Sequence, residues 1–265
     1  MSELIETPPE DARPFVVPCR QLAPNAPLRW LKRGWQDVRA EPRLTLIFGG
    51  GILLVSVLVS ALAWALGRFA LLATLLSGFV FIAPLIGVGL YCVAREREAG
   101  RVPSISHSFT LACRVAGQAG VFALAQLVVL LLWSRAGMMV GAFIPVSEGN
   151  TQHLLEYLLV GSAAGSIFAT LTFASMAFSL PMIADRDVDM VTAIVSSIHA
   201  VLRNKLTMLV WAALILFLTL VGFATAYIGL VVIMPWLAYS TSHSYTETLD
   251  VDGWPKLEGD CLERR

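Results

Sequence analysis

The sequence predicts an all-α fold, a polytopic membrane helix bundle. Three observations support this: the composition, long apolar runs and an uneven distribution of basic residues. Hydrophobic residues make up 57% of the 265 positions and charged residues 14%, whereas charged residues approach about a quarter of a soluble domain. The formal net charge is zero, which gives no overall field for attracting nucleic acid. We therefore expect the lipid bilayer as a partner and no nucleic acid.

Six apolar runs are candidates for transmembrane helices, because a hydrocarbon core of ~30 Å requires roughly 20 residues of helix. They cover approximately residues 44–66, 69–93, 115–133, 154–184, 207–221 and 223–239. The fifth and sixth runs abut at Gly222, so they could form either one long apolar block or a tight hairpin.

Basic residues distinguish the two sides of the predicted membrane. Of the 19 Lys and Arg residues, all but Arg68 and Arg135 fall in the two ends of the chain and in the connections after the second and fourth runs. Cytoplasmic loops carry the excess of Lys and Arg in membrane proteins. We therefore predict that both the N-terminus and the C-terminus are cytoplasmic.

Three regions follow from this topology. Proline and charged residues dominate both ends of the chain, which leaves little apolar surface to offset the entropy of ordering. We expect a disordered cytoplasmic segment at residues 1–27, a six-span membrane domain at 28–245 and a cytoplasmic tail at 246–265.

An internal repeat is indicated in the second, fourth and sixth runs. Residues 83–87, 180–184 and 234–238 share the order apolar, Pro, large apolar, Ile or Leu, small. A moderately amphipathic stretch with basic residues precedes each pair of runs, at 28–38, 109–114 and 194–205. The sequence therefore predicts three hairpin repeats with interfacial amphipathic helices. Because proline removes one helical hydrogen bond, we expect helix kinks at Pro84, Pro181 and Pro235.

Four stretches resemble a bacterial integral-membrane family catalogued as domain of unknown function 2189. They are the basic and aromatic opening at residues 30–35, the segment 83–91, the segment 179–189 with its alternating acidic residues and Arg, and the closing segment 243–245. The resemblance covers about residues 28–245. It implies a multi-pass protein of the bacterial inner (cytoplasmic) membrane, and it supplies no activity.

Some relatives in that family carry a cytochrome c oxidase label, which the histidines of this chain can test. A haem-copper centre requires several histidines inside the bilayer as metal ligands. The four histidines here are His107, His153, His199 and His243, and all fall in connections or at the ends of the predicted spans. We therefore expect no haem or other cofactor, whereas a respiratory-chain accessory subunit stays open as an alternative.

A cluster of acidic residues follows the fourth run on the predicted cytoplasmic side. Asp185 and Asp187, with His199 and His243 on the same side, are weak candidates for metal ligands, because carboxylate and imidazole groups bind divalent cations. No spacing typical of a metal motif is present. The other interpretation is a solvated helix end whose charges pair locally.

Three polar residues fall within or near the predicted spans. Gln118 and Gln126 are eight residues apart and so lie near one helical face; they could line a polar path or hydrogen-bond to neighbouring helices. Glu156 lies at the outer end of the fourth run, where it is either a buried acid or a water-exposed cap.

The sequence shows no catalytic set: it has no HExxH, no CxxC and no phosphate-binding glycine loop. We therefore expect a protein that is not an enzyme and that handles a small solute or lipid, or that assists the assembly of other membrane proteins. The alternative is a membrane-embedded enzyme, which requires Asp185, Asp187, His199 and His243 to converge.

The topology is testable with reporter fusions at the C-terminus. Because the basic residues place that end in the cytoplasm, a C-terminal alkaline phosphatase fusion is expected to be inactive and a green fluorescent protein fusion to be fluorescent. The reverse pattern would contradict the predicted orientation.

Overall fold

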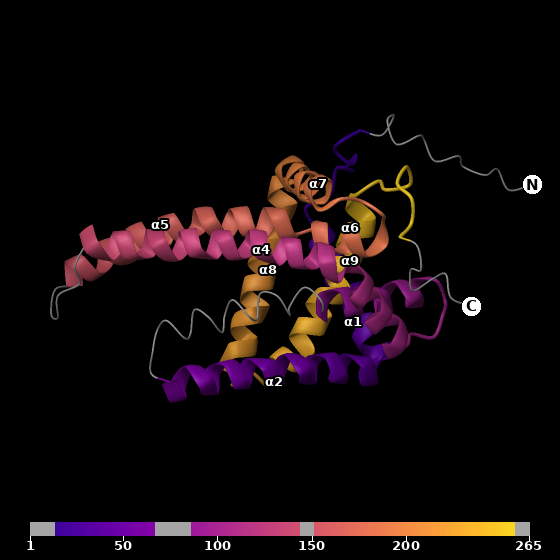
Figure 1. The fold of residues 1–265 in the computed structure, drawn as a ribbon, viewed down its shortest axis with the longest axis horizontal. Coiled ribbons are helices and arrows are strands. Elements are labelled where there is room, and N and C mark those ends of the chain that lie inside the picture. The colour runs from indigo at the N-terminus through magenta and orange to yellow at the C-terminus, as the bar shows by residue number, and fades with distance from the viewer. Residues whose placement is uncertain (1–13, 67–85, 144–150, 258–265) are drawn as a thin grey trace, which may run out of the picture.

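A computed structural model describes residues 14–66, 86–143 and 151–257 (Figure 1). The predicted all-helical fold is confirmed, and this part of the chain contains no strand. The helices are α1 (Ala26–Ala40), α2 (Pro42–Leu66), α4 (Ile105–Phe143), α5 (Thr151–Met176), α6 (Ser179–Asp185), α7 (Met190–Arg203), α8 (Lys205–Ala224) and α9 (Leu230–Thr248). A further helical segment covers residues 86–98. Pro84, Arg68 and most of the second apolar run lie outside the described residues.

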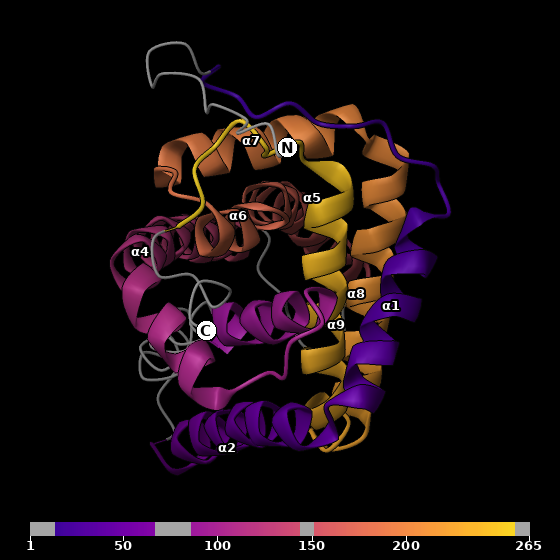
Figure 2. The same cartoon turned by 90° about the vertical axis from the view of Figure 1, so that its right-hand side faces the viewer.

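Two pairs of helices dominate the architecture. α4 and α5 form a long antiparallel hairpin that extends to the left in Figure 1, and α8 and α9 run crosswise to it, as Figure 2 also shows. α2 lies on the opposite side of the molecule from the α4–α5 hairpin, with α8 and α9 between them in Figure 1. α9, the last of the described helices, packs against α1, α2, α6 and α8.

Three described helices are long and apolar enough to cross a membrane, by length and composition. They cover Ile105–Phe143, Leu155–Asp185 and Lys205–Ala224. A fourth is possible if α1 and residues 42–58, which meet at a bend of 103°, count as one span. The six spans and the threefold repeat are not confirmed and stay predictions.

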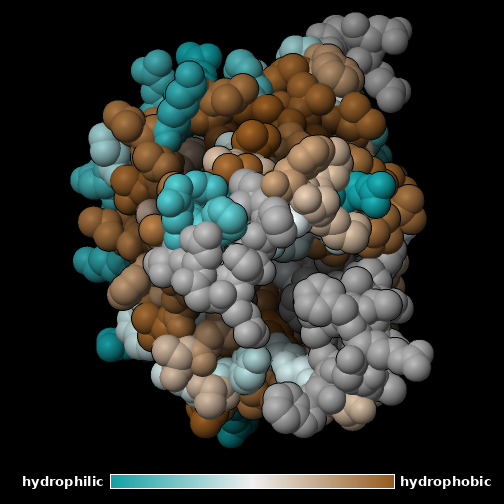
Figure 3. Space-filling view, turned by 90° about the vertical axis from the view of Figure 1, so that its left-hand side faces the viewer, coloured by the Kyte–Doolittle hydropathy of each residue, from teal (hydrophilic) through white to brown (hydrophobic). Residues whose placement is uncertain are grey.

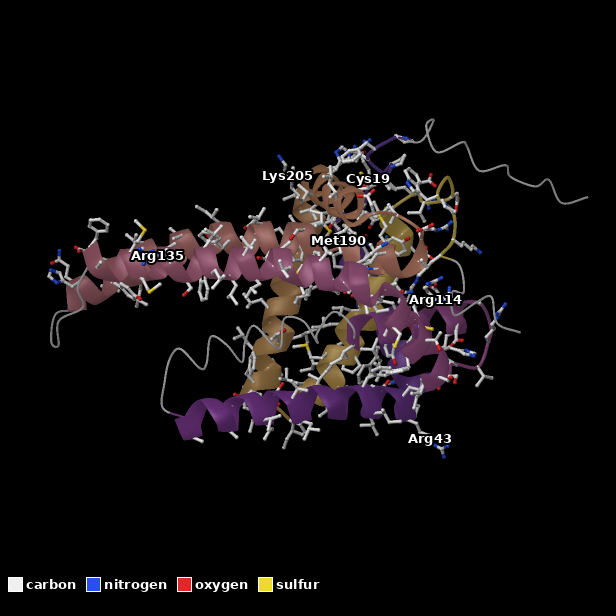
Figure 4. All side chains as sticks on the ribbon, viewed as in Figure 1. Cys19, Arg43, Arg114, Arg135, Met190 and Lys205 are labelled. Atoms are coloured by element: carbon white, nitrogen blue, oxygen red, sulfur yellow. The ribbon has the colours of Figure 1, made fainter. Side chains whose placement is uncertain are left out.

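Basic side chains are also separated along the molecule. Figure 4 places Arg135 toward the far end of the α4–α5 hairpin, whereas Arg114 and Arg43 lie at the opposite end of the molecule. Much of the face seen from the far end of that hairpin is hydrophobic (Figure 3). The orientation of the chain in the membrane stays a prediction.

The first amphipathic stretch forms α1, and its apolar face packs against protein. Trp30, Leu31 and Gly34 are buried, whereas Lys32 and Arg33 between them are exposed. The Nε1 atom of Trp236 in α9 donates a hydrogen bond to the carbonyl oxygen of Leu31 at 2.8 Å. We expected this face to lie in the membrane interface; α9 covers it instead, because the absence of a Cβ at Gly34 lets the two helices approach closely.

The other two amphipathic stretches differ from each other. Residues 109–114 continue directly into α4 as part of one 39-residue helix. Residues 194–203 belong to α7, a separate helix that begins where Asp189 accepts a hydrogen bond from the N–H of Thr192 and ends at Asn204. A side-chain cap of this kind stops a helix from extending backwards, whereas residues 109–114 lie inside α4, which begins at Ile105.

The fourth apolar run is broken between α5 and α6. In a continuous helix the N–H of Phe178 would bond to the carbonyl of Ala174. Here the hydroxyl of Ser197 from α7 lies between them: it accepts from the Phe178 N–H at 3.0 Å and donates to the Ala174 carbonyl at 2.7 Å. Pro181 follows as the third residue of α6 and is buried. The inserted hydroxyl and the proline both interrupt the regular helical hydrogen bonds of this run, and a kink at Pro181 stays a prediction.

The proline of α9 is compensated by a close backbone contact. Pro235 has no N–H to donate to the carbonyl of Val231, four residues earlier. Gly49 of α2 packs against that carbonyl so closely that a Cβ built on the glycine would lie 1.9 Å from the oxygen. The glycine Cα–H therefore covers the carbonyl that the proline leaves unbonded.

Both ends of the chain pack against the helices where they are described. Val17 is fully buried and its N–H donates to Ser196 in α7, and Trp254 is 7% exposed. The N–H of Asp187 bonds to Pro255 and that of Leu257 bonds to Asp185. Short apolar segments within residues 14–27 and 249–257 thus find buried positions, and the three predicted regions stay predictions. Residues 1–13 and 258–265 lie outside the described residues.

The contact at Gly49 is testable by comparison with its neighbours. Gly49→Ala is expected to destabilise the protein by about 1–3 kcal/mol, because the methyl group forces α2 away from the Val231 carbonyl. A Cβ at Gly50 or Gly51 meets nothing within 4 Å, so Gly50→Ala and Gly51→Ala serve as matched controls that gain helix propensity. Thermal unfolding in detergent measures the difference; equal loss in all three variants would contradict this packing.

Candidate functional site

A network of charged side chains, most of them buried, joins helix 86–98, α1, α6 and α9. Its first half surrounds Asp185, the last residue of α6. Asp185 pairs with Arg95 at 2.8 Å and with Arg186 at 3.1 Å, and it accepts a hydrogen bond from the hydroxyl of Tyr245 at 2.8 Å. Arg95 also donates to the carbonyl of Ala184 at 2.9 Å.

The second half of the network is centred on His243 in α9. Its Nε2 atom lies 2.6 Å from Asp37 of α1, and its Nδ1 atom lies 2.8 Å from Glu98. The Nε atom of Arg97 lies 3.0 Å from the other oxygen of Asp37, as an ion pair that lacks the alignment of a hydrogen bond. Glu96 turns to the start of α4 and lies 2.6 Å from His107.

The two carboxylates beside His243 determine which protonation state of its imidazole fits this arrangement. Burial alone lowers the pKa of the imidazole, but the hydrogen bonds to Asp37 and Glu98 and the negative charges of both carboxylates raise the pKa to about 9. An imidazolium donates from both ring nitrogens, one to each carboxylate. Burial, with the nearby Asp185, raises the pKa of Tyr245 well above its ordinary value, which keeps its hydroxyl as a donor.

The four weak metal-ligand candidates do not come together in the structure. Asp185 and His243 lie in its two halves, each held by other partners, whereas Asp187 and His199 are exposed. Both nitrogens of His243 face carboxylates, so neither offers a lone pair to a metal ion. Within the described ranges no group of three or more His, Cys, Asp and Glu residues could hold a metal ion.

Sequence reasoning missed Asp37, Arg95, Arg97 and Glu98 as members of this network. Two signals could have found them. Asp37 falls in the buried stripe of α1, which also contains Trp30, Gly34 and Val38, so it is an acid where an apolar residue is expected. Residues 95–98 alternate Arg and Glu, a pattern that supplies paired charges of both signs.

A cavity of about 760 Å³ lies beside the network, between the α4–α5 hairpin, α6, α8, α9 and helix 86–98. Aromatic and aliphatic side chains form most of its wall; the aromatic ones are Tyr91, Phe122, Trp133, Phe168, Phe173 and Trp211. Gln126, Thr172 and Thr241 add polar groups, and no charged residue of the described chain lines the cavity. A volume of this size falls within the range of about 300–1,000 Å³ that small-molecule sites occupy.

The three polar residues predicted in or near spans occupy different environments. Gln126 borders the cavity and is 8% exposed; its Nε2 donates to Ser175 at 2.9 Å, and its Oε1 is buried without a hydrogen-bond partner. Gln118 is half-buried, and its Oε1 also lacks a partner. Glu156 is exposed and bonds to Gln152 at 3.0 Å, as a water-exposed cap would.

A protein-family model matches the central part of the chain. Residues 71–185 match a family described as predicted integral membrane protein (DUF2189). The resemblance seen in the sequence is confirmed for this segment. No curated protein and no solved structure matches the chain.

The segment that matches DUF2189 contains part of the charge network and part of the cavity wall. It includes Arg95, Glu98 and Asp185 of the charge network, and the α4, α5 and α6 walls of the cavity. Asp37 and His243, which complete the network, lie outside it. The matched segment and the apolar helices support a predicted integral membrane protein of unknown function.

The pKa of His243 predicts how stability changes with pH. A group whose pKa is raised by folding stabilises the protein fully below its unfolded value, here 6.5, and loses that contribution as the pH rises through its folded value of about 9. We expect the free energy of unfolding to fall by on the order of 2–3 kcal/mol across this interval.

Unfolding by denaturant in detergent, followed by circular dichroism at several pH values, measures this loss. The His243→Gln variant is expected to be less stable at neutral pH and to lack the decline. Parallel pH profiles for the variant and the unmodified chain would contradict the proposed pairing.

Proposed function

We propose that this protein is a non-enzymatic membrane protein that binds a small apolar or amphipathic molecule from the bilayer. The cavity of about 760 Å³ between the α4–α5 hairpin and α8 carries this proposal. Its wall is mostly apolar, with a few polar groups, which is the usual make-up of a small-molecule site.

The lining favours a lipid-like molecule over a hydrophilic solute. A hydrophilic solute would leave its polar groups unpaired against the aromatic and aliphatic wall, at a cost of several kcal/mol. An acyl or isoprenoid chain has no polar group to leave unpaired when it enters the cavity, and it can contact six aromatic side chains there.

The alternative of a membrane-embedded enzyme has less support. It requires Asp185, Asp187, His199 and His243 to converge, and two of the four are exposed outside the network. An accessory role beside other membrane proteins, including a respiratory-chain complex, remains compatible with lipid binding. We also infer, from the distribution of basic residues, a location in the bacterial inner membrane with both termini cytoplasmic.

Filling the cavity tests the proposal. Ala169 in α5 lines the cavity, so Ala169→Trp is expected to displace the bound molecule and lower binding of a tritiated long-chain alcohol at least tenfold. Ala163 is exposed on the same helix and does not line the cavity, which makes Ala163→Trp a matched control with unchanged binding.

Measurement uses the full chain purified in detergent, with bound lipid identified by native mass spectrometry and affinity measured by scintillation proximity. Thermal unfolding confirms that both variants are folded. Saturable binding that survives Ala169→Trp would overturn the cavity as the site, and the absence of saturable binding to the unmodified chain would overturn the function.

A further inference from the structure

We propose that the cavity holds an extended apolar chain of about 14 carbons, whose terminal carbon lies at a closed end beside Phe122 and whose polar end lies at a mouth beside Trp133. This inference rests on the proposed function, because it names the length and orientation of the molecule that the same cavity binds. Three observations support it: the length of the cavity along the α4–α5 hairpin, its small width, and the different exposure of its two ends.

The α4–α5 hairpin sets the length of the cavity. On α4 the lining residues run from Phe122 to Trp133, and within α5 they run from Gly165 to Met176. Each pair is separated by eleven positions in the sequence, which corresponds to about 16 Å at ~1.5 Å per residue of α-helix. A Cβ built on Gly165 would lie 3.5 Å from the Nε1 atom of Trp133, so these two residues mark the same end of the cavity.

The cavity is narrow for this length. A volume of about 760 Å³ spread over about 16 Å leaves a mean width of about 7 Å, so the cavity is a slot along the hairpin. An extended polypeptide advances ~3.5 Å over the three main-chain bonds of a residue, or about 1.2 Å per bond. An extended alkyl chain consists of similar single bonds, so about 14 carbons span the slot from one end to the other.

The two ends of the slot differ in exposure. α6 follows α5 at the Phe122 end, and helix 86–98 contacts α6. The lining residues that these elements supply are buried: Leu180 is 5% exposed, Tyr91 is 7% exposed, and Phe122 is fully buried. At the other end Trp133 is 47% exposed, and the hairpin continues toward Arg135 (Figure 4). The slot is therefore closed beside Phe122 and open beside Trp133.

This difference orients the bound molecule. No charged residue of the described chain lines the cavity to balance an ionised group. Among its polar lining residues, Thr241 already donates its hydroxyl proton to the carbonyl of Leu237 at 2.8 Å. Burying a polar group without a partner is unfavourable, whereas Trp is enriched where the apolar and polar layers of a bilayer meet. The polar end of the molecule therefore stays at Trp133, and the apolar chain points toward the closed end.

Photo-crosslinking tests both the orientation and the length. Octyl and tetradecyl alcohols that carry a diazirine at the terminal carbon are reacted with the unmodified full-length chain in detergent, and mass spectrometry of the peptides locates the label. The tetradecyl probe is expected to label the closed end, around Phe122 and Met176. The octyl probe reaches about half of the slot and is expected to label around Val129 and Thr172. An excess of unlabelled cetyl alcohol is expected to abolish both signals.

A larger side chain at the closed end provides a second measurement. Ala177 lines the cavity directly after Met176 and is 7% exposed. Ala177→Leu is therefore expected to shorten the slot and to lower closed-end labelling by the tetradecyl probe about tenfold. Labelling by the octyl probe is expected to stay unchanged, which also shows that the variant is folded. Ala163 is exposed on α5 and lies outside the lining, so Ala163→Leu is the matched control in which neither signal changes.

The outcomes separate this inference from the function on which it rests. If both probes label the same positions of the unmodified chain, the slot does not select chain length and the inference fails, while lipid binding stands. Labelling around Trp133 by the tetradecyl probe would show the reverse orientation, and unchanged closed-end labelling in a folded Ala177→Leu variant would place the closed end elsewhere; either result overturns the inference. If cetyl alcohol displaces neither probe, the proposed function itself fails. The comparison of the two probes on the unmodified chain stays decisive even if Ala177→Leu does not fold.

Discussion

Pairing of buried charges is the constraint on which the arrangement of this protein depends. An unpaired ionised group removed from water costs several kcal/mol, and breaking a buried pair typically costs about 3–5 kcal/mol. Asp37, Arg95, Asp185 and His243 are each less than 10% exposed, and they come from four different helical elements. Because each has a partner on another element, the network fixes how α1, helix 86–98, α6 and α9 meet. The cavity lies directly beside this junction, since Tyr91 is one helical turn from Arg95 and Thr241 is two residues from His243.

Hydrogen bonding of the backbone is the second constraint, and it acts at each break in an apolar helix. Lipid cannot bond to a carbonyl that a proline leaves free. In α9 the carbonyl opposite Pro235 is covered by the backbone of Gly49, and at the α5–α6 break the hydroxyl of Ser197 bridges the two separated groups. Different neighbours thus satisfy the backbone at the two places: a glycine backbone at the carbonyl that Pro235 leaves free, and a serine hydroxyl at a helix break that precedes Pro181.

The sequence predicted features that depend on neighbouring residues, and it did not predict contacts between residues that are far apart along the chain. Apolar periodicity predicted α2, α4, the α5–α6 run and α8, because burial in lipid or protein is a local property of composition. The two runs that abut at Gly222 form two helices joined by a short turn, in which Ala226 and Tyr227 adopt left-handed φ values of 51° and 69°. Nothing local in the sequence distinguishes such a turn from a continuous helix. Apart from Arg186, which is adjacent to Asp185, the partners of His243 and Asp185 were equally inaccessible, because they lie 60 to 206 residues away along the chain. The buried amide of Gln126 was identified as a polar residue in a span, but the cavity beside it depends on helices that cross at positions no spacing rule gives.

The long sequence separation between the members of the network has a consequence for biogenesis. Membrane helices emerge from the ribosome in order, and N-terminal parts of a chain generally fold first. Asp37 is synthesised 206 residues before its partner His243, and Asp185 60 residues before Tyr245. The early helices are therefore synthesised before these two contacts can form. Asp37 can pair with Arg97 and Asp185 with Arg95 earlier, and the contacts of His243 and Tyr245 follow only when α9 docks.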